Sequence, residues 1–367
     1  MMIRQASPAD VDGVMTVYQA VYGSNESLGL EPYPEPEFFD RAALVALLAR
    51  ETLFIAVIDH AVVGCVAVYW DLYHSAPAVL DDLVVSPDYR NRAIAQHLVQ
   101  HAVGYLDDQG SVLATVQTIT SQPYSQRVFF NNGFTQVVGL DLCRYPQVYR
   151  LGIYESSFIQ RRVNPSLAER EVAMTPVFVP HRYKNVVEAI MASGPSFISP
   201  AVQTATNGNQ LSALRYRAEQ QSHGWVAEVY ESNSESCNGR ALVAELFESL
   251  SIAMAHQDYV QVKLPANQGE CIDLANQLME MGFLFHSFLC SVNPLGVSTG
   301  ERDILTMQWV NPCRFPDHGS GSGESSDLDW IPVSSNPKHD GFRAIVELID
   351  KECSLSIGVS LNRLYVQ

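Results

Sequence analysis

One stretch decides the fold of this chain: Leu80-Asp81-Asp82-Leu83-Val84-Val85-Ser86-Pro87-Asp88-Tyr89-Arg90-Asn91-Arg92-Ala93-Ile94-Ala95. A short β-branched run with two carboxylates meets a proline and turns, through small and basic residues, into an amphipathic helix. Where a strand runs into a helix N-terminus, unpaired backbone N–H groups point outward and the helix dipole adds partial positive charge. Such a turn binds anions, most often phosphates. The stretch therefore predicts a site for a phosphorylated ligand beside an acidic strand.

The composition is that of a packed protein outside the membrane. The chain has 367 residues, of which 47% are hydrophobic, so two domains and an appendage are expected. No apolar run approaches the roughly 20 residues of a membrane helix, and the N-terminus lacks an apolar signal core. The seven cysteines form no Cys-x-x-Cys pair, which favours buried free thiols. We therefore expect a cytoplasmic protein with no membrane partner.

The charge pattern narrows the choice of ligand. A formal net charge of −17 disfavours nucleic acid and anionic membranes as partners. No lysine precedes Lys184, so Arg90 and Arg92 must supply any phosphate-binding charge of the first half. His97 and His101 have a metal-compatible spacing of four residues, but no third ligand is evident, and we expect no metal.

Hydrophobic periodicity predicts a mixed α/β sandwich over the first 145 residues. A helix start at Ser7-Pro8-Ala9-Asp10 leads into a helix that reaches Tyr22. Further helices are expected at about 37–50, about 92–108 and 125–132, and strands at 3–6, 52–57, 61–70, 79–85, 112–118 and 134–142.

The second half repeats this pattern weakly. Residues 146–172 are charged and irregular, a predicted linker, and strand and helix patterns return from Pro176. The run Val116-Gln117 … Asn132-Gly133-Phe134 corresponds to Val260-Gln261 … Met281-Gly282-Phe283, which indicates an internal repeat. Residues 317–327 are rich in glycine and serine and predict a flexible linker before a C-terminal strand and helix.

With these elements placed, the first 145 residues resemble the GNAT superfamily of acyl-CoA-dependent N-acyltransferases. The family signature, Arg/Gln-x-x-Gly-x-Gly/Ala between a strand and a helix, stands here as Arg90-Asn91-Arg92-Ala93-Ile94-Ala95. A second family motif, a short helix ending in Gly-Phe, stands as Ser125 to Phe134. The resemblance covers 1–145 and, more faintly, 174–312.

The resemblance implies tandem GNAT-like folds, in which mixed, mostly antiparallel sheets are flanked by helices. We expect an acyltransferase domain at 1–145, a linker at 146–172, a degenerate GNAT-like domain at 173–316, and a flexible linker with an appendage at 317–367. The loop after the predicted strand Trp225–Tyr230 carries two acids and lacks the Arg-x-x-Gly-x-Ala pattern, so the second copy is expected to be non-catalytic.

The resemblance also implies how acetyl-CoA would be held. Backbone N–H groups of Arg92 to Ala95 would cradle the pyrophosphate, and the pantetheine arm would pair with backbone groups of the acidic strand where the sheet splays open. Ala93 stands where the family has a glycine; we expect alanine to fit a helical first turn and to reduce binding at most. The expected binding residues are Leu83, Val84, Val85, Arg90, Asn91, Arg92, Ala93, Ile94 and Ala95.

For catalysis, family precedent places an acidic residue at this point of the strand. Asp81 and Asp82 are adjacent and would face opposite sides of a regular strand, so one of them would take a proton from the acceptor amine. The alternative is that either carboxylate merely pairs with an arginine or meets solvent. Phe129 stands where the family has a tyrosine that protonates the departing thiolate; Tyr124, Ser125 or water would substitute.

The leading hypothesis is a GNAT-type N-acetyltransferase that moves an acetyl or short acyl group from acetyl-CoA to an amine by direct attack in a ternary complex. The acceptor would be a small-molecule amine or a peptide. The protein could also form a homodimer. The alternative is a non-catalytic acyl-CoA-binding or regulatory protein, favoured by Phe129, Ala93 and the degenerate second half.

Overall fold

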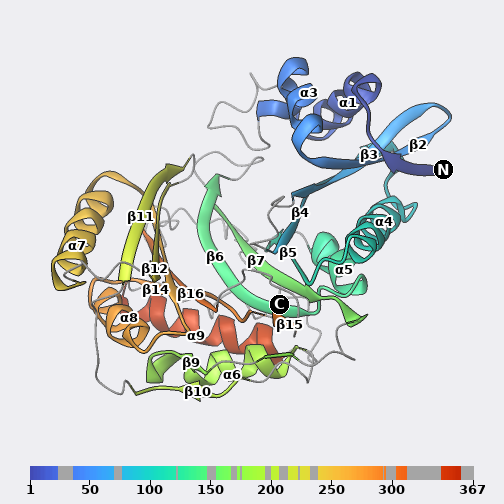
Figure 1. The fold of residues 1–367 in the computed structure, drawn as a ribbon. Coiled ribbons are helices and arrows are strands. Elements are labelled where there is room, and N and C mark those ends of the chain that lie inside the picture. Colours follow the sequence, from blue (N-terminus) through green and yellow to red (C-terminus); the bar gives the residue numbers. More distant parts are fainter. Residues whose placement is uncertain are drawn as a thin grey trace, which may run out of the picture.

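The computed structural model describes residues 1–23, 36–69, 77–120, 123–146, 154–166, 172–173, 176–194, 200–205, 214–221, 224–231, 239–291, 293–294, 303–311 and 340–356. One sheet of 12 strands runs through both halves, in the order β1-β2-β3-β4-β5-β7-β6-β14-β16-β13-β12-β11 (Figure 1). Two of its neighbouring pairs, β4 with β5 and β12 with β13, are parallel and the others are antiparallel. The predicted mixed α/β fold with a mostly antiparallel sheet flanked by helices is confirmed.

The first half supplies seven strands of this sheet. They are β1 (Met2–Gln5), β2 (Thr52–Ile58), β3 (Ala61–Tyr69), β4 (Ala78–Val85), β5 (Leu113–Ile119), β6 (Gln136–Pro146) and β7 (Tyr154–Val163). Its helices are α1 (Val11–Tyr22), α3 (Arg41–Arg50), α4 (Ile94–Asp108) and α5 (Pro123–Asn131), with short 3-10 turns at η1 (Pro8–Asp10), η2 (Pro36–Phe39) and η3 (Pro87–Tyr89).

The second half supplies the remaining five strands. They are β11 (Leu214–Gln221), β12 (Gly224–Glu231), β13 (Tyr259–Pro265), β14 (Leu284–Leu289) and β16 (Ile304–Val310). Its helices are α6 (Lys184–Ala192), α7 (Gly239–His256), α8 (Glu270–Glu280) and α9 (Asp340–Ser356), with a 3-10 turn η5 (His181–Tyr183). Short two-stranded pairs form between β9 (Val177–Phe178) and β10 (Val202–Gln203), and between β8 (Val172–Ala173) and β15 (Asn293–Pro294).

The two halves repeat one order of pairings. Strands β3-β4-β5-β7-β6 pair antiparallel, parallel, antiparallel and antiparallel, and β11-β12-β13-β16-β14 do the same. In each half a helix connects the parallel strands, α4 in the first and α7 in the second. The halves meet where β6 lies beside β14, with Gly139 opposite Ser287. A Cβ on Gly139 would lie 2.4 Å from the His286 carbonyl oxygen, so the two strands approach closely there.

Strand β7 lies within the segment 146–172, which was predicted to be a linker. Residues 154–163 were expected to be irregular, but they form a central strand between β5 and β6. Buried arginines conceal the strand pattern: Arg161 donates to the Gln136 side chain and the Cys290 carbonyl, both at 2.5 Å, and Arg162 pairs with Asp107 through two bonds of 2.8 Å. Buried cations are tolerated when every donor direction finds an acceptor.

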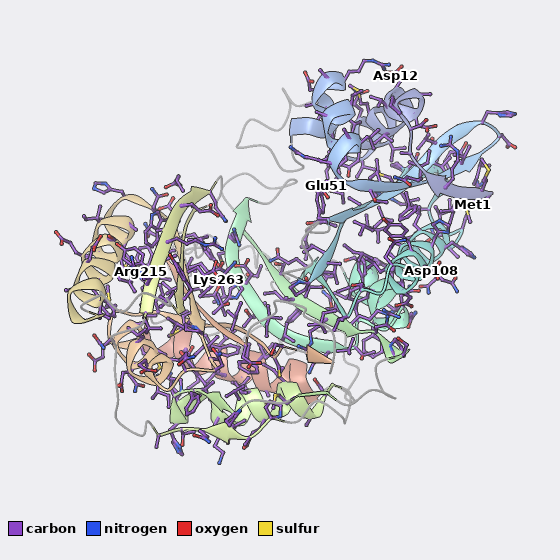
Figure 2. The ribbon with its side chains drawn as sticks, in the orientation of Figure 1. Met1, Asp12, Glu51, Asp108, Arg215 and Lys263 are labelled. Atoms are coloured by element: carbon purple, nitrogen blue, oxygen red, sulfur yellow. The ribbon has the colours of Figure 1, made fainter. Side chains whose placement is uncertain are left out.

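Two separate cores cover the faces of the first-half sheet. One lies under α4 and includes Leu80, Leu98 and Phe129, and the other lies under α1 and α3 and includes Tyr18 and Val84. In Figure 2, Asp12 marks α1 and Asp108 marks the end of α4, on the two sides of this sheet. The described helices include none that is both long and apolar enough to span a membrane.

Candidate functional site

The sheet opens between β4 and β5. The two strands pair only from Ala78 with Ala114 to Leu80 with Val116, although β4 continues to Val85 and β5 to Ile119. Beyond Leu80 the edge of β4 that faces β5 therefore has no ladder partner among the described strands. Backbone N–H and C=O groups at such an edge can pair with an extended ligand as with another strand.

A β-bulge interrupts β4 at the start of this opening. The ladder with β3 shifts between Cys65 opposite Val84 and Ala67 opposite Asp81, so two residues of β4 stand against one of β3. Asp82 lies within the bulge and has φ +54°, in the left-handed region. The prediction that Asp81 and Asp82 face opposite sides assumed a regular strand, and the bulge removes that premise.

Asp82 is held by two tyrosines. The Tyr69 hydroxyl, at the end of β3, donates to the Asp82 carboxylate, and the Tyr18 hydroxyl, on α1, donates to its carbonyl oxygen at 3.3 Å. Burial raises the pKa of Tyr18 well above its ordinary value, and the charge of Asp82 adds to this effect, so the hydroxyl stays a donor. Both tyrosines belong to the core under α1, which places Asp82 on that side of the sheet.

Asp81 has different surroundings. Its Oδ1 accepts the backbone N–H of Asp82 at 2.8 Å, and the residue is half-buried. Burial raises the pKa of the Asp81 carboxyl, against the opposing effect of the hydrogen bond from Asp82. A carboxyl with a raised pKa beside an open sheet edge is suited to accept a proton.

The turn into α4 follows directly. After η3, Asn91 has φ +61° and Ala93 has φ +57°, and α4 begins at Ile94. The expectation that Ala93 fits a helical first turn is wrong, because its backbone is left-handed, a conformation that costs a non-glycine residue about 1–2 kcal/mol. The strained residue is the fourth of the segment Arg90–Ala95 and directly precedes α4.

The N-terminus of α4 offers donors for an anion. The first helical bond runs from the His97 N–H to the Ala93 carbonyl at 3.1 Å, so the N–H groups of Ile94, Ala95 and Gln96 precede it and find no backbone acceptor within the described chain. Arg90 and Arg92 are exposed on the same turn, with the Arg92 guanidinium 5.1 Å from the Tyr89 ring centre. Donors and positive charge together fit a pyrophosphate.

The two candidate acids stand on another element. Tyr124 and Ser125 lie in the first turn of α5, where Tyr124 is 78% exposed. Phe129, on the same helix, is buried and packs edge-on against Phe134 with ring centres 5.4 Å apart.

The structure places two tyrosines, Tyr18 and Tyr69, around Asp82. The sequence did not reveal their role, because a tyrosine in an apolar pattern is indistinguishable from a core residue.

Comparison with known proteins finds a family match over part of the chain. Residues 16–134 match the acetyltransferase (GNAT) family. The GNAT match spans the opening of the sheet, the turn into α4 and the whole of α5. A search of curated proteins finds no match.

Solved GNAT structures resemble part of the chain. The ribosomal-protein-S18-alanine N-acetyltransferase of Escherichia coli shares 14% identity and a TM-score of 0.36, covering 44% of this chain and 93% of its own. The paia N-acetyltransferase of Thermoplasma acidophilum, in complex with coenzyme A, shares 16% identity and a TM-score of 0.33, covering 44% and 98%. The putative acetyltransferase yncA of Salmonella typhimurium, with acetyl-CoA, shares 14% identity and a TM-score of 0.35, covering 44% and 93%.

Proposed function

We propose that the first half is an N-acetyltransferase that moves an acetyl or short acyl group from acetyl-CoA to an amine. The observation that carries the proposal is that the edge of β4, which beyond Leu80 has no ladder partner among the described strands, is followed along the chain by the N–H groups that begin α4. An extended amide-bearing arm suits the first and a pyrophosphate suits the second. The GNAT match to residues 16–134 supports the same ligand.

The binding roles follow from backbone positions. Leu83, Val84 and Val85 would pair with the pantetheine arm, and the segment from Arg90 to Ala95 would hold the phosphates. When bound, acetyl-CoA supplies an activated thioester. A backbone N–H near Val85 would polarise its carbonyl, which favours the charge that develops on oxygen during attack.

The carboxylates of the bulge would serve the acceptor. An amine is protonated in neutral water and must lose a proton before its nitrogen can attack, and a carboxylate at β4 accepts that proton. Holding amine and thioester together makes attack effectively intramolecular. The nitrogen–carbon bond forms, the carbon–sulfur bond breaks, and the thiolate takes a proton from Tyr124, Ser125 or water.

Two measurements test the proposal. Calorimetric titration with acetyl-CoA measures binding, and the release of free thiol with a panel of small amines and peptides measures transfer. Arg92→Glu should abolish acetyl-CoA binding, because it reverses a charge on the turn before α4 that would hold the phosphates. Arg127→Glu, the same change on α5, is the matched control and should leave binding intact. Absence of acetyl-CoA binding by the wild-type protein would refute the proposal.

The alternative function, an acyl-CoA-binding or regulatory protein, is favoured by Phe129, which is buried where GNAT enzymes place a donor. Binding of acetyl-CoA without transfer across the whole panel would establish this alternative.

We also propose that 173–316 is a degenerate second GNAT-like copy, supported by the repeated order of strand pairings. Among the described residues, the buried Cys65, Cys143, Cys271 and Cys290 form no disulfide, which supports the proposal of a reducing, cytoplasmic location.

A further inference from the structure

The two carboxylates at the bulge are in unequal surroundings. Asp82 receives the Tyr69 hydroxyl on its carboxylate and the Tyr18 hydroxyl on its carbonyl oxygen. The Asp81 carboxylate receives the N–H of Asp82 on Oδ1, and it makes no other hydrogen bond within the described residues. One carboxylate is therefore anchored by a side chain, and the other keeps an oxygen for a ligand.

Resting on the acetyltransferase proposed above, we propose that Tyr69 is a positioning residue: its hydroxyl fixes the Asp82 carboxylate, and Asp81 takes the proton of the acceptor amine. The sequence left open which of the two adjacent aspartates accepts the proton; here Asp81 accepts it, and Asp82 is held in place beside it. This assignment also gives a function to a tyrosine outside the family motifs.

The backbone explains why Asp82 needs an anchor. A left-handed aspartate within a strand is strained and persists only where its surroundings fix it. Tyr69 reaches Asp82 from the end of β3, where it pairs with Val79, and Tyr18 reaches it from α1. Strand and helix thus hold the bulge from two directions, so the Asp82 carboxylate stays beside Tyr69.

The position of Asp81 fits proton transfer. It is the first residue of β4 beyond the last pair with β5, Leu80 with Val116, and so stands where the sheet opens. The ammonium N–H bond breaks, an O–H bond forms on Asp81, and the nitrogen keeps its lone pair for attack. Burial brings the pKa of Asp81 upward, toward the pH at which a base is most effective.

The first test is the pH profile of kcat/KM for transfer to the best amine of the panel. Asp81→Asn should lower kcat/KM at neutral pH by about 10²–10⁴-fold, with acetyl-CoA binding retained. Tyr69→Phe should lower it about tenfold and move the acid limb to lower pH, because an Asp82 that protonates more readily repels the Asp81 charge less. Tyr105→Phe, a hydroxyl on α4 under the other face, is the control for loss of a tyrosine hydroxyl.

The second test needs no turnover. Carboxyl-carbon NMR of aspartate-labelled protein, assigned with Asp81→Asn and Asp82→Asn, follows the ionisation of each group. Asp81 should titrate at higher pH than Asp82, and Tyr69→Phe should bring the two titrations closer, because a donor to the charged form favours that form.

The outcomes separate the two proposals. Acetyl-CoA binding without transfer by the wild-type protein would refute the proposed function and the proton transfer to Asp81 with it, and the titration would still decide whether Tyr69 holds the Asp82 carboxylate in its charged form. An Asp82 that titrates above Asp81, or a Tyr69→Phe profile that superimposes on that of the wild type, would overturn the assignment.

Discussion

Replacing Ala93 by glycine should stabilise this protein, although alanine-to-glycine changes usually destabilise. Ala93 has φ +57° and ψ +17°, immediately before α4. The left-handed backbone costs alanine about 1–2 kcal/mol and costs glycine almost nothing. Glycine gives back about 0.4–1 kcal/mol by making the unfolded chain more flexible. The expected net gain is therefore roughly 0.5–1 kcal/mol.

Equilibrium urea unfolding measures this gain. Thermal unfolding is a poor readout, because an unfolding entropy of about 2 cal/mol/K per residue makes 1 kcal/mol worth only about 1 °C in a chain of this length. Ala95→Gly is the matched control: the same exchange two residues later, inside α4, should destabilise by about 0.5–1 kcal/mol. Equal destabilisation by both changes would refute the left-handed assignment of Ala93. We expect Ala93→Gly to bind acetyl-CoA at least as tightly, since the missing Cβ lets the backbone approach a phosphate.

Three further predictions concern packing and charge. Gly139→Ala should lower the free energy of unfolding in urea by about 1–3 kcal/mol, because its Cβ would lie 2.4 Å from the Ser287 Cβ. Gly104→Ala, on α4 with open space around the new Cβ, should instead raise it by up to about 1 kcal/mol. Burial opposes ionisation of Asp141, but His286 and Arg144 outweigh burial and hold the pKa of the Asp141 carboxyl below its ordinary value. The Asp141 carboxylate therefore stabilises the folded protein at pH values above the pKa that the group has in the unfolded chain. This stabilisation is lost as the pH falls through the pKa of Asp141 in the folded protein. Asp141→Asn should therefore cost about 3–5 kcal/mol at pH 7 and flatten the loss of stability below pH 4; parallel pH curves of the two proteins would contradict this. Phe129→Tyr should destabilise by about 1–3 kcal/mol and leave kcat unraised, because the added hydroxyl would be buried in the core under α4; a faster enzyme would show that this position faces the thiol.

The opening stretch could be predicted because its signals are local. A β-branched run, a proline and a helix pattern specify strand, turn and helix whatever surrounds them. The strain at Ala93 and the bulge at Asp82 could not be predicted from the same letters, since a positive φ at alanine or aspartate is imposed by neighbouring elements. The anchoring by Tyr69 is likewise a contact between residues 13 positions apart on two strands.

Strand β7 was missed for a different reason. Its alternation is hidden by Arg161 and Arg162, which are buried only because Gln136, Asp107 and the Cys290 carbonyl receive them. Those partners lie far away in the sequence, and one of them belongs to the second half. A strand stabilised by long-range polar contacts has no local pattern by which to recognise it.

The junction between β6 and β14 limits how this protein can be divided. In a fragment that ends at residue 166, β6 would become an edge strand, with Leu140 and Leu142 stripped of their cover and the amide of Gln308 no longer bridging to them. Exposed apolar edges recruit other chains, so such a fragment should aggregate rather than yield a smaller folded protein. Transfer of the proposed site to a new context therefore requires the whole chain, including the half that carries none of the proposed chemistry.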